Sequence, residues 1–592
     1  MRPEIIAMIN KNCQKIISAL KAHGWVIIFS FLLAVLIFAP LLAFPWAAGS
    51  LYQGININHF GNDAHFYLTR GNEVLSGNSL GSPLLREGKN DPDVYLSYSD
   101  YLLLAPVKLS GLEKKFNIVT IYNFYNFIGV FVLIILIYFF VLQLSGDKLL
   151  SLTAALFVIG GYSIIYFKIF FYHDFNAYAR VLYPYLSSLV LFTYLNLLVK
   201  CLKSAELRYK IFAGLAFGLL FYIYFYAWSF VLAFNACLLL IFIFKKDFLP
   251  AKTVCLISAL GLALGAYNLI KLFSALGGGI GAQLSYFMHL SLGHTPVFSK
   301  VGFITLILFA LFWQRRRQDQ YLPLILAVIL SGWAALNQQT ITGKMLQYGH
   351  YYWYFIVPLS IVVSFYMVWR LLASEKLKKI LFIVLIAAVF INTAGGQYLS
   401  FFSSYEAKIY EQNFQPIIDS LNRDLAPAAI LAGQENSYLF TIYTPHDLFW
   451  LNAAALSYLP IQRFKDALFV YAFLNKEARN NFTEYFTRAG DDGVGSSFYR
   501  ALYRDLASYY EYANKAADNK TSYQGPQALA DQLSQEYNDA VIKNDGIDGL
   551  LEKYGVSYIV WDKNLDPEWD LSFFGDRLKE ITSFNNIYLY RL

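Results

Sequence analysis

The segment 118–143 reads IVTIYNFYNFIGVFVLIILIYFFVLQ and contains no charged side chain. An α-helix rises about 1.5 Å per residue, so roughly 20 apolar residues cross the hydrocarbon core of a bilayer. The segment is long enough and apolar enough to do so. It is therefore predicted to be a membrane-spanning helix, and the number of similar segments decides the fold.

Ten further segments share this apolar character. They are 25–44, 149–170, 182–202, 211–226, 228–244, 251–273, 300–313, 321–337, 353–372 and 380–398. The aromatic run 221–228 is predicted to form an interfacial turn between two of them, because aromatic side chains favour the membrane–water interface. The sequence thus predicts a polytopic α-helical membrane protein with about eleven transmembrane helices.

The composition supports this fold class. Of 592 residues, 57% are hydrophobic and 15% are charged, against about 25% charged in a soluble domain. The net charge of +7 divides into +16 for residues 1–400 and −9 for residues 401–592. A soluble enzyme and a simple nucleic-acid binder are excluded, and no nucleic-acid partner is expected. The chain is instead a basic, apolar body followed by an acidic, soluble-looking region.

Basic residues gather in alternate connections between the spans, which predicts that these connections are cytoplasmic. Residues 1–24 are then a cytoplasmic amphipathic segment, residues 25–400 the transmembrane domain, and residues 401–592 an extracytoplasmic domain. The expected location is the plasma (inner) membrane of a bacterium or archaeon. The extracytoplasmic domain is predicted to be mixed α/β, with strands at 429–433, 555–561 and 586–590 and a helical part over 462–545.

Three outer connections carry the candidate functional residues. The first, 45–117, holds seven of the fourteen acidic residues of the membrane body, which is a strong concentration. The others are 171–181 and 338–352. Charged groups facing lipid are costly, so these side chains are expected to face a water-filled cavity. The candidates are Asp63, Asp100, His173, Asp174, Arg180, Lys344, Gln347 and His350.

Acidic and cationic groups on one face of a membrane suit transfer from a phosphate donor. A carboxylate can take the proton of the incoming hydroxyl group. Cations and amide donors can neutralise the departing phosphate. The predicted chemistry is therefore group transfer from a membrane-bound phosphate.

The layout resembles the GT-C superfamily of membrane glycosyltransferases. The stretch Asn62-Asp63-Ala64-His65-Phe66-Tyr67 matches the position of that family's acidic residue after the first span. The resemblance implies that Asp63 is the general base, with Asn62, His65 and Tyr67 as its neighbours. It also implies a second acidic or acceptor element at His173, Asp174 and Asp100. A late outer loop with Lys344, Gln347 and His350, together with Arg180, would then bind the donor phosphate.

By the same resemblance the donor is a polyprenyl-phosphate-linked sugar, and the sugar is transferred with inversion to a lipid, glycan or cell-envelope polymer. The first loop lacks an Asp-x-Asp motif, so a divalent metal such as Mg or Mn, held by Asp63 and Asp174, stays open. Residues 401–592 also lack the Trp-Trp-Asp signature of the oligosaccharyltransferase catalytic subunit. Monosaccharide-type transfer is therefore expected, rather than transfer of a whole glycan to asparagine.

Alternatives remain at this point. A transporter or lipid flippase usually has interrupted helices or repeated halves, and no internal repeat is visible here. A non-catalytic scaffold for envelope polysaccharide assembly would have the same architecture as the enzyme. Plain structural roles are also open: helix capping for Asp63, an ion pair with Asp174 for Arg180, and snorkelling to the interface for Lys344 and His350.

Overall fold

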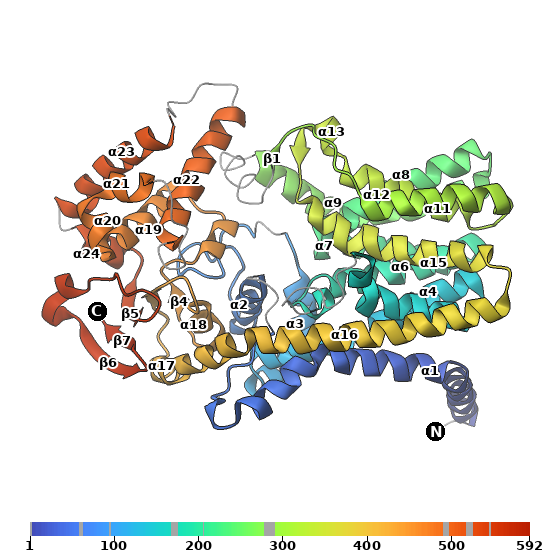
Figure 1. The fold of residues 1–592 in the computed structure, drawn as a ribbon, viewed down its shortest axis with the longest axis horizontal. Helices are drawn as coiled ribbons and strands as arrows, with labels where there is room; N and C mark the ends of the chain where they lie inside the picture. Colours follow the sequence, from blue (N-terminus) through green and yellow to red (C-terminus); the bar gives the residue numbers. More distant parts are fainter. Residues whose placement is uncertain are drawn as a thin grey trace.

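The computed structural model describes residues 3–58, 63–93, 96–166, 176–204, 206–277, 291–488, 497–516, 525–543 and 546–592. Figure 1 shows long helices on one side, a sheet-containing C-terminal region on the other, and helices α2 and α3 between them. The long helix α16 runs along both parts. Buried apolar side chains form one continuous cluster from Val26 near the N-terminus to Leu589 near the C-terminus.

Nine helices among the described residues are long and apolar enough to cross a membrane. They are α1 (Pro3–Ala48), α4 (Ile118–Ser145), α5 (Lys148–Leu156, continued by short turns to Tyr166), α6 (Tyr185–Lys203), α8 (Phe225–Phe244), α9 (Phe248–Gly277), α12 (Leu322–Leu336, followed by α13, Gln339–Thr342), α14 (Tyr348–Tyr351, continuing into α15, Val357–Leu371) and α16 (Glu375–Glu411). The polytopic helical fold is confirmed.

The other two expected spans, 211–226 and 300–313, correspond to α7 (Leu207–Ile223) and α11 (Lys300–Arg316). Each has 17 residues and is slightly shorter than the nine. Only Tyr224 separates α7 from α8, and its backbone is extended, so the predicted turn within the aromatic run is present. Helix α7 packs against α6 and α9, and α11 packs against α15 and α12, while both keep large apolar side chains exposed.

Helices α7 and α9 lie side by side because glycines face large side chains at their contact. Added Cβ atoms at Gly214 and Gly218 would lie 2.7 Å from Leu260 and Leu264 respectively. Residue numbers rise in the same direction along both helices at these contacts, so the two helices are parallel. Small residues four positions apart let helix backbones approach closely in a membrane, so this pair forms a rigid part of the bundle.

The basic ends of several helices gather at one end of the bundle. Lys148 Nζ donates to the carbonyl of Ala22 at 2.8 Å. Lys203 Nζ and Tyr321 OH both donate to the carbonyl of Gln143, at 2.5 and 2.9 Å. These bonds bring together the end of the N-terminal segment and the regions around residues 143–148, 203 and 321. All of these regions were predicted to lie on the same side of the membrane. The backbone of α1 breaks at His23, close to the expected start of the first span.

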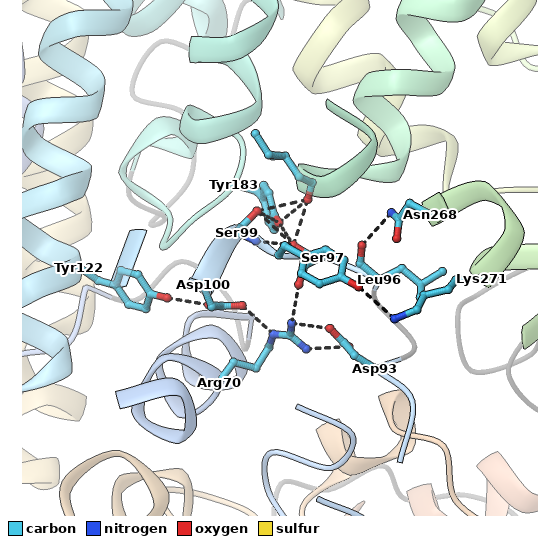
Figure 2. A network of polar contacts seen from close by, with 12 residues as sticks. Arg70, Asp93, Leu96, Ser97, Ser99, Asp100, Tyr122, Tyr183, Asn268 and Lys271 are labelled. Atoms are coloured by element: carbon cyan, nitrogen blue, oxygen red, sulfur yellow. Dashed lines mark hydrogen bonds and ion pairs between the residues drawn. The ribbon is translucent and has the colours of Figure 1, made fainter. Parts of the chain in front are cut away.

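The first outer connection contains α2 (Asp63–Ser76) and α3 (Ser99–Ser110), and a buried arginine ties them together. Arg70 donates through Nη1 and Nη2 to Asp93 at 2.9 and 2.8 Å, and through Nε to Asp100 at 3.0 Å. Tyr122 of α4 donates to the other oxygen of Asp100 at 2.6 Å. Figure 2 shows that these groups converge from three elements, so the loop is anchored to a membrane helix.

The C-terminal region has a five-stranded sheet in the order β4-β3-β5-β7-β6. Strand β3 is parallel to β4 and β5, whereas β7 is antiparallel to β5 and β6. The three expected strands are confirmed as β3, β5 and β7, and a helical part follows the first two strands. The elements are α17 (Gln415–Leu421), β3 (Ala429–Ala432), α18 (Tyr438–Tyr443), β4 (Asp447–Leu448), α19 (Ile461–Leu474), α20 (Lys476–Asn480), α21 (Phe482–Thr487), α22 (Ser497–Ala516), α23 (Pro526–Tyr537), α24 (Gly546–Lys553), β5 (Val556–Asp562), β6 (Lys579–Phe584) and β7 (Ile587–Arg591).

Replacing Asp100 by leucine should strongly destabilise the protein. Arg70 is 1% exposed and Asp100 is fully buried, and removing one partner of a buried ion pair costs about 3–5 kcal/mol. We expect the Glu206→Gln control, in an exposed pair with Arg208, to lose no more than about 1 kcal/mol. Denaturant titration of the protein in detergent micelles measures both. Equal losses in the two variants would contradict the role of the buried pair.

The stability of the C-terminal region should fall as the pH rises from about 4 to about 8. Burial, with repulsion from Glu568, Asp562 and Glu435, raises the pKa of Asp566 from 3.8 to about 8. Between these two pKa values the folded state keeps the proton of Asp566, whereas the unfolded state has released it. Each rise in pH within this window therefore favours unfolding. Thermal unfolding of the full chain across this range should show the trend.

The Asp566→Asn variant should lose this pH dependence because its side chain does not titrate. Asp576→Asn, at an exposed position, is the matched control and should keep the trend of the parent protein. A parent protein whose stability is flat over this window would contradict the assignment.

Candidate functional site

Asp63 and Arg180 form an ion pair at the end of the bundle opposite its basic end. Asp63 is the first residue of α2, and its Oδ2 accepts a hydrogen bond from Arg180 Nη2. Arg180 Nη1 donates to the hydroxyl of Tyr354, whose ring centroid lies 5.8 Å from the guanidinium carbon. The side chain of Asp63 is 54% exposed, whereas that of Arg180 is 12% exposed. An accessible carboxylate thus lies against a mostly buried cation.

Local sequence places each partner. A carboxylate in the first turn of a helix interacts favourably with the helix dipole, as Asp63 does. The carbonyl just before Arg180, that of Ala179, accepts hydrogen bonds from Asn58 Nδ2 at 2.9 Å and Asn126 Nδ2 at 3.3 Å. These amides come from the first outer connection and from α4, so the backbone that carries Arg180 is held from two sides.

The charge state of Arg180 follows from its surroundings. Burial alone would lower its pKa, but the neighbouring Tyr354 and Asp63 raise it above the ordinary value. The guanidinium is therefore a permanent cation. A permanent positive charge of this kind suits an anionic ligand, because the planar guanidinium matches the geometry of phosphate and carboxylate groups.

Aromatic side chains connect this pair to His350. Tyr224 OH and His350 Nδ1 share a hydrogen bond of 2.6 Å, and the His350 ring centroid lies 5.5 Å from that of Tyr354. On the other side of Tyr224, the Tyr183 ring stacks with centroids 4.4 Å apart. Tyr67 of α2 contacts Tyr183 edge-on at 5.3 Å. Tyr67, Tyr183, Tyr224 and Tyr354 thus form a row of aromatic side chains, called the tyrosine wall below. The imidazole of His350 is oriented by this wall next to Arg180.

The structure brings together some of the predicted residues and separates others. Asp63, Arg180, His350 and Tyr67 belong to one cluster. Lys344 lies on the short strand β2 (Lys344–Met345), which pairs with β1 (Ser291–Leu292), and its side chain is exposed.

Gln347 and Lys344 belong to the same outer connection as His350. Gln347 precedes α14, and its carbonyl accepts from the backbone N–H of His350 at 3.1 Å. Neither Lys344 nor Gln347 has a side-chain hydrogen bond or ion pair to Asp63, Arg180 or His350 among the described residues. Their predicted phosphate role stays a prediction.

Asp100 does not fit the acceptor role that the sequence suggested. Both of its oxygens are occupied, by Arg70 and Tyr122, and the side chain is fully buried. Its role is to hold α2 and α3 together. The ring of His65, two residues after Asp63, stacks on Tyr438 of the C-terminal region. The remaining predicted residues, Asn62, His173 and Asp174, lie outside the described residues.

A divalent metal ion would need several oxygen ligands. In the described part of the chain, no group of three or more His, Cys, Asp or Glu side chains lies close enough to hold one. The described donor set at Asp63 is one carboxylate already bound by Arg180, which does not fit a metal ion. Asp174, the other predicted ligand, lies outside the described residues, so binding of Mg or Mn stays a prediction.

Several residues of the cluster were not anticipated from the sequence. Tyr354 lies within a predicted span, and Tyr224 lies in a run that reads as an interfacial belt. Tyr183 is one of 46 tyrosines in the chain. The useful signal was their position, because each of these tyrosines is close to the outer end of a predicted span. Tyr183 and Tyr354 also follow within a few residues of a predicted polar connection.

The solved structures that resemble this chain include two of the Archaeoglobus fulgidus oligosaccharyltransferase. One is the apo form, with a TM-score of 0.45 and 11% identity. The other is tethered to an acceptor peptide containing the NVT sequon through a disulfide bond, with a TM-score of 0.45 and 12% identity. Each match covers 91% of this chain and 69% of the other.

No protein-family model and no curated protein sequence matches the chain. The low TM-score and identity of these two structures transfer no residue role to this chain, and the roles of Asp63 and Arg180 must be argued from their own contacts.

Proposed function

We propose that this protein is a membrane glycosyltransferase that moves a sugar from a polyprenyl-phosphate-linked donor to an acceptor hydroxyl group at the outer membrane face. The observation that carries the proposal is the pairing of an accessible carboxylate, Asp63, with a largely buried cation, Arg180, at one end of the bundle. Group transfer from a phosphate needs a base for the nucleophile and positive charge for the leaving group. This site offers both within one contact.

In the proposed reaction, the acceptor hydroxyl group loses its proton to Asp63 while its oxygen attacks the anomeric carbon. The bond between that carbon and the phosphate oxygen breaks, and its electron pair leaves with the phosphate. Arg180 neutralises the developing negative charge, and His350, oriented by Tyr224, is placed to donate a hydrogen bond. A single displacement of this kind inverts the anomeric configuration.

The orientation of the chain is part of this proposal. Helices α6 and α15 run from the neighbourhood of Arg180 and Tyr354 to the end where Lys203 and Arg370 lie. Basic connections favour the cytoplasmic side, so the Asp63 end would face outward, together with the C-terminal region. We further propose that this membrane is the plasma membrane of a bacterium or archaeon and that the site faces a lipid, glycan or envelope-polymer acceptor.

Replacing Asp63 by asparagine should reduce sugar transfer by about 10²–10⁴-fold, the usual contribution of a general base, while the donor still binds. Transfer from a synthetic polyprenyl-phosphate sugar to an alcohol acceptor by the purified protein in detergent measures this. Asp91→Asn is the matched control, because Asp91 is an exposed carboxylate in the same connection. Unchanged transfer by Asp63→Asn would refute the proposed mechanism.

Replacing Arg180 by glutamine should weaken binding of a non-hydrolysable polyprenyl-phosphonate. A hydrogen bond to a charged group contributes about 1.5–3 kcal/mol, roughly a ten- to hundred-fold rise in Kd. Arg180→Lys should recover part of the loss, because it restores the charge without the planar fork. Isothermal titration calorimetry measures the Kd of the phosphonate for the parent protein, Arg180→Gln and Arg180→Lys. The same measurement on Lys344→Gln tests the phosphate role predicted from the sequence. Undiminished binding by Arg180→Gln would contradict the assignment.

A further inference from the structure

Helix α2, which begins at Asp63, lies between the membrane helices and the C-terminal region (Figure 1). On its membrane side, Arg70 holds it to α3 through the buried ion pair with Asp100. Gly71 approaches α4 so closely that an added Cβ atom would lie 2.6 Å from Tyr122 and 2.7 Å from Ile118. This side of α2 is therefore fixed near its middle, about two turns after Asp63.

The opposite side of α2 contacts α18 of the C-terminal region. His65, Thr69 and Asn72 recur at helical spacing and so share one face. Thr69 Oγ1 and Thr441 Oγ1 share a hydrogen bond of 2.8 Å, and Asn72 Nδ2 donates to the Thr441 carbonyl at 2.9 Å. The C-terminal region thus contacts α2 along its length, including its first turn.

The contact with the first turn is a ring stack. The rings of His65 and Tyr438 lie parallel within 7°, with centroids 3.3 Å apart. The first turn of a helix is its least stable part because its N–H groups have no intrahelical partners. Since His65 is two residues after Asp63, a ring packed on it restrains the turn that carries the carboxylate.

Tyr438 is itself held by the end of α16. Its hydroxyl donates to Glu411 Oε1 at 2.9 Å. One residue further, Gln412 accepts hydrogen bonds from the backbone N–H groups of Gln53 and Ile55 at 3.0 and 3.2 Å, and donates to the Ile55 carbonyl at 2.9 Å. The same end of α16 therefore fixes both Tyr438 and the segment that leads into α2.

We propose that Tyr438 is a positioning residue: by stacking on His65, it lets the C-terminal region hold the first turn of α2 so that the Asp63 carboxylate stays on Arg180. This inference rests on the proposed function. Misplacing a catalytic group by about 1 Å can cost about a hundred-fold in rate, so loss of the stack should act on the chemical step. The phosphate contacts proposed for Arg180 and His350 do not involve α18, so donor binding should persist.

The test compares Tyr438→Leu, which removes the stacking ring, with Tyr438→Phe, which keeps the ring and removes the hydroxyl. We expect Tyr438→Leu to lower kcat about 10- to 100-fold with the donor KM unchanged within about two-fold. Tyr438→Phe should stay within about three-fold of the parent, because the ring remains. His65→Leu removes the same stack from the other side, so His65→Leu/Tyr438→Leu should be no slower than the slower single variant.

A control variant and a second readout separate positioning from general damage. Tyr590→Leu removes a stacked tyrosine elsewhere in the C-terminal region, where Tyr588 and Tyr590 lie 6.0 Å apart and within 8° of parallel. It should leave kcat unchanged. Hydrogen exchange should become faster over residues 63–70 in Tyr438→Leu and in His65→Leu, and stay unchanged in α4. Tyr438→Leu and His65→Leu each remove one ring of the same stack. If one of these variants misfolds, the other still tests the proposal.

The outcomes of the two proposals are distinguishable. If Asp63→Asn abolishes transfer but Tyr438→Leu and His65→Leu behave like Tyr590→Leu, the positioning role is overturned and the proposed function stands. If Asp63→Asn transfers normally, the proposed function fails, and hydrogen exchange over residues 63–70 still decides whether Tyr438 anchors the turn. A rise in the donor KM without a fall in kcat would overturn the positioning role, because it would place Tyr438 in donor binding.

Discussion

The buried guanidinium of Arg70 is the interaction on which the outer half of the molecule depends. A charge this deeply buried is tolerated only with partners that satisfy it, and Asp93 and Asp100 come from later in the same connection. Satisfying Arg70 therefore folds a long connection back onto itself and onto Tyr122 of α4 (Figure 2). This constraint fixes the middle of α2, the helix that begins with Asp63, against α3 and α4.

The same network reaches the tyrosine wall. Ser97 and Ser99, just before Asp100, each share a hydrogen bond with Tyr183 OH, at 2.6 and 2.7 Å. Tyr183 stacks on Tyr224, which bonds His350. The ion-pair network of Arg70, Asp93 and Asp100 and the tyrosine wall of the candidate site are therefore connected by hydrogen bonds and ring stacking. On the other side the C-terminal region meets α2 through Tyr438 and Thr441, so the site lies where three parts of the chain converge.

Two of the candidate residues, Asp63 and Arg180, were expected at the same membrane face, and the structure brings them into contact. Asp63 begins a helix after the first span, and Arg180 follows the third, so both belong at the same membrane face. The reasoning failed for Asp100, because an acidic residue in an acidic loop has the same local pattern whether it faces a substrate or a buried arginine. It also missed Tyr354, since a tyrosine near the end of an apolar span is common. Burial and partner decide such cases, and both are tertiary properties.

The sequence by itself determined the membrane helices, their alternation of charge and the mixed C-terminal sheet, because these follow from hydropathy and spacing within short windows. The tertiary structure decided which charges meet. Asp63 and Arg180 are 117 positions apart, and nothing in the sequence near either residue shows that they pair. Ion pairs form where the fold brings side chains within a few ångströms. That distance depends on how the helices pack, which no local pattern records.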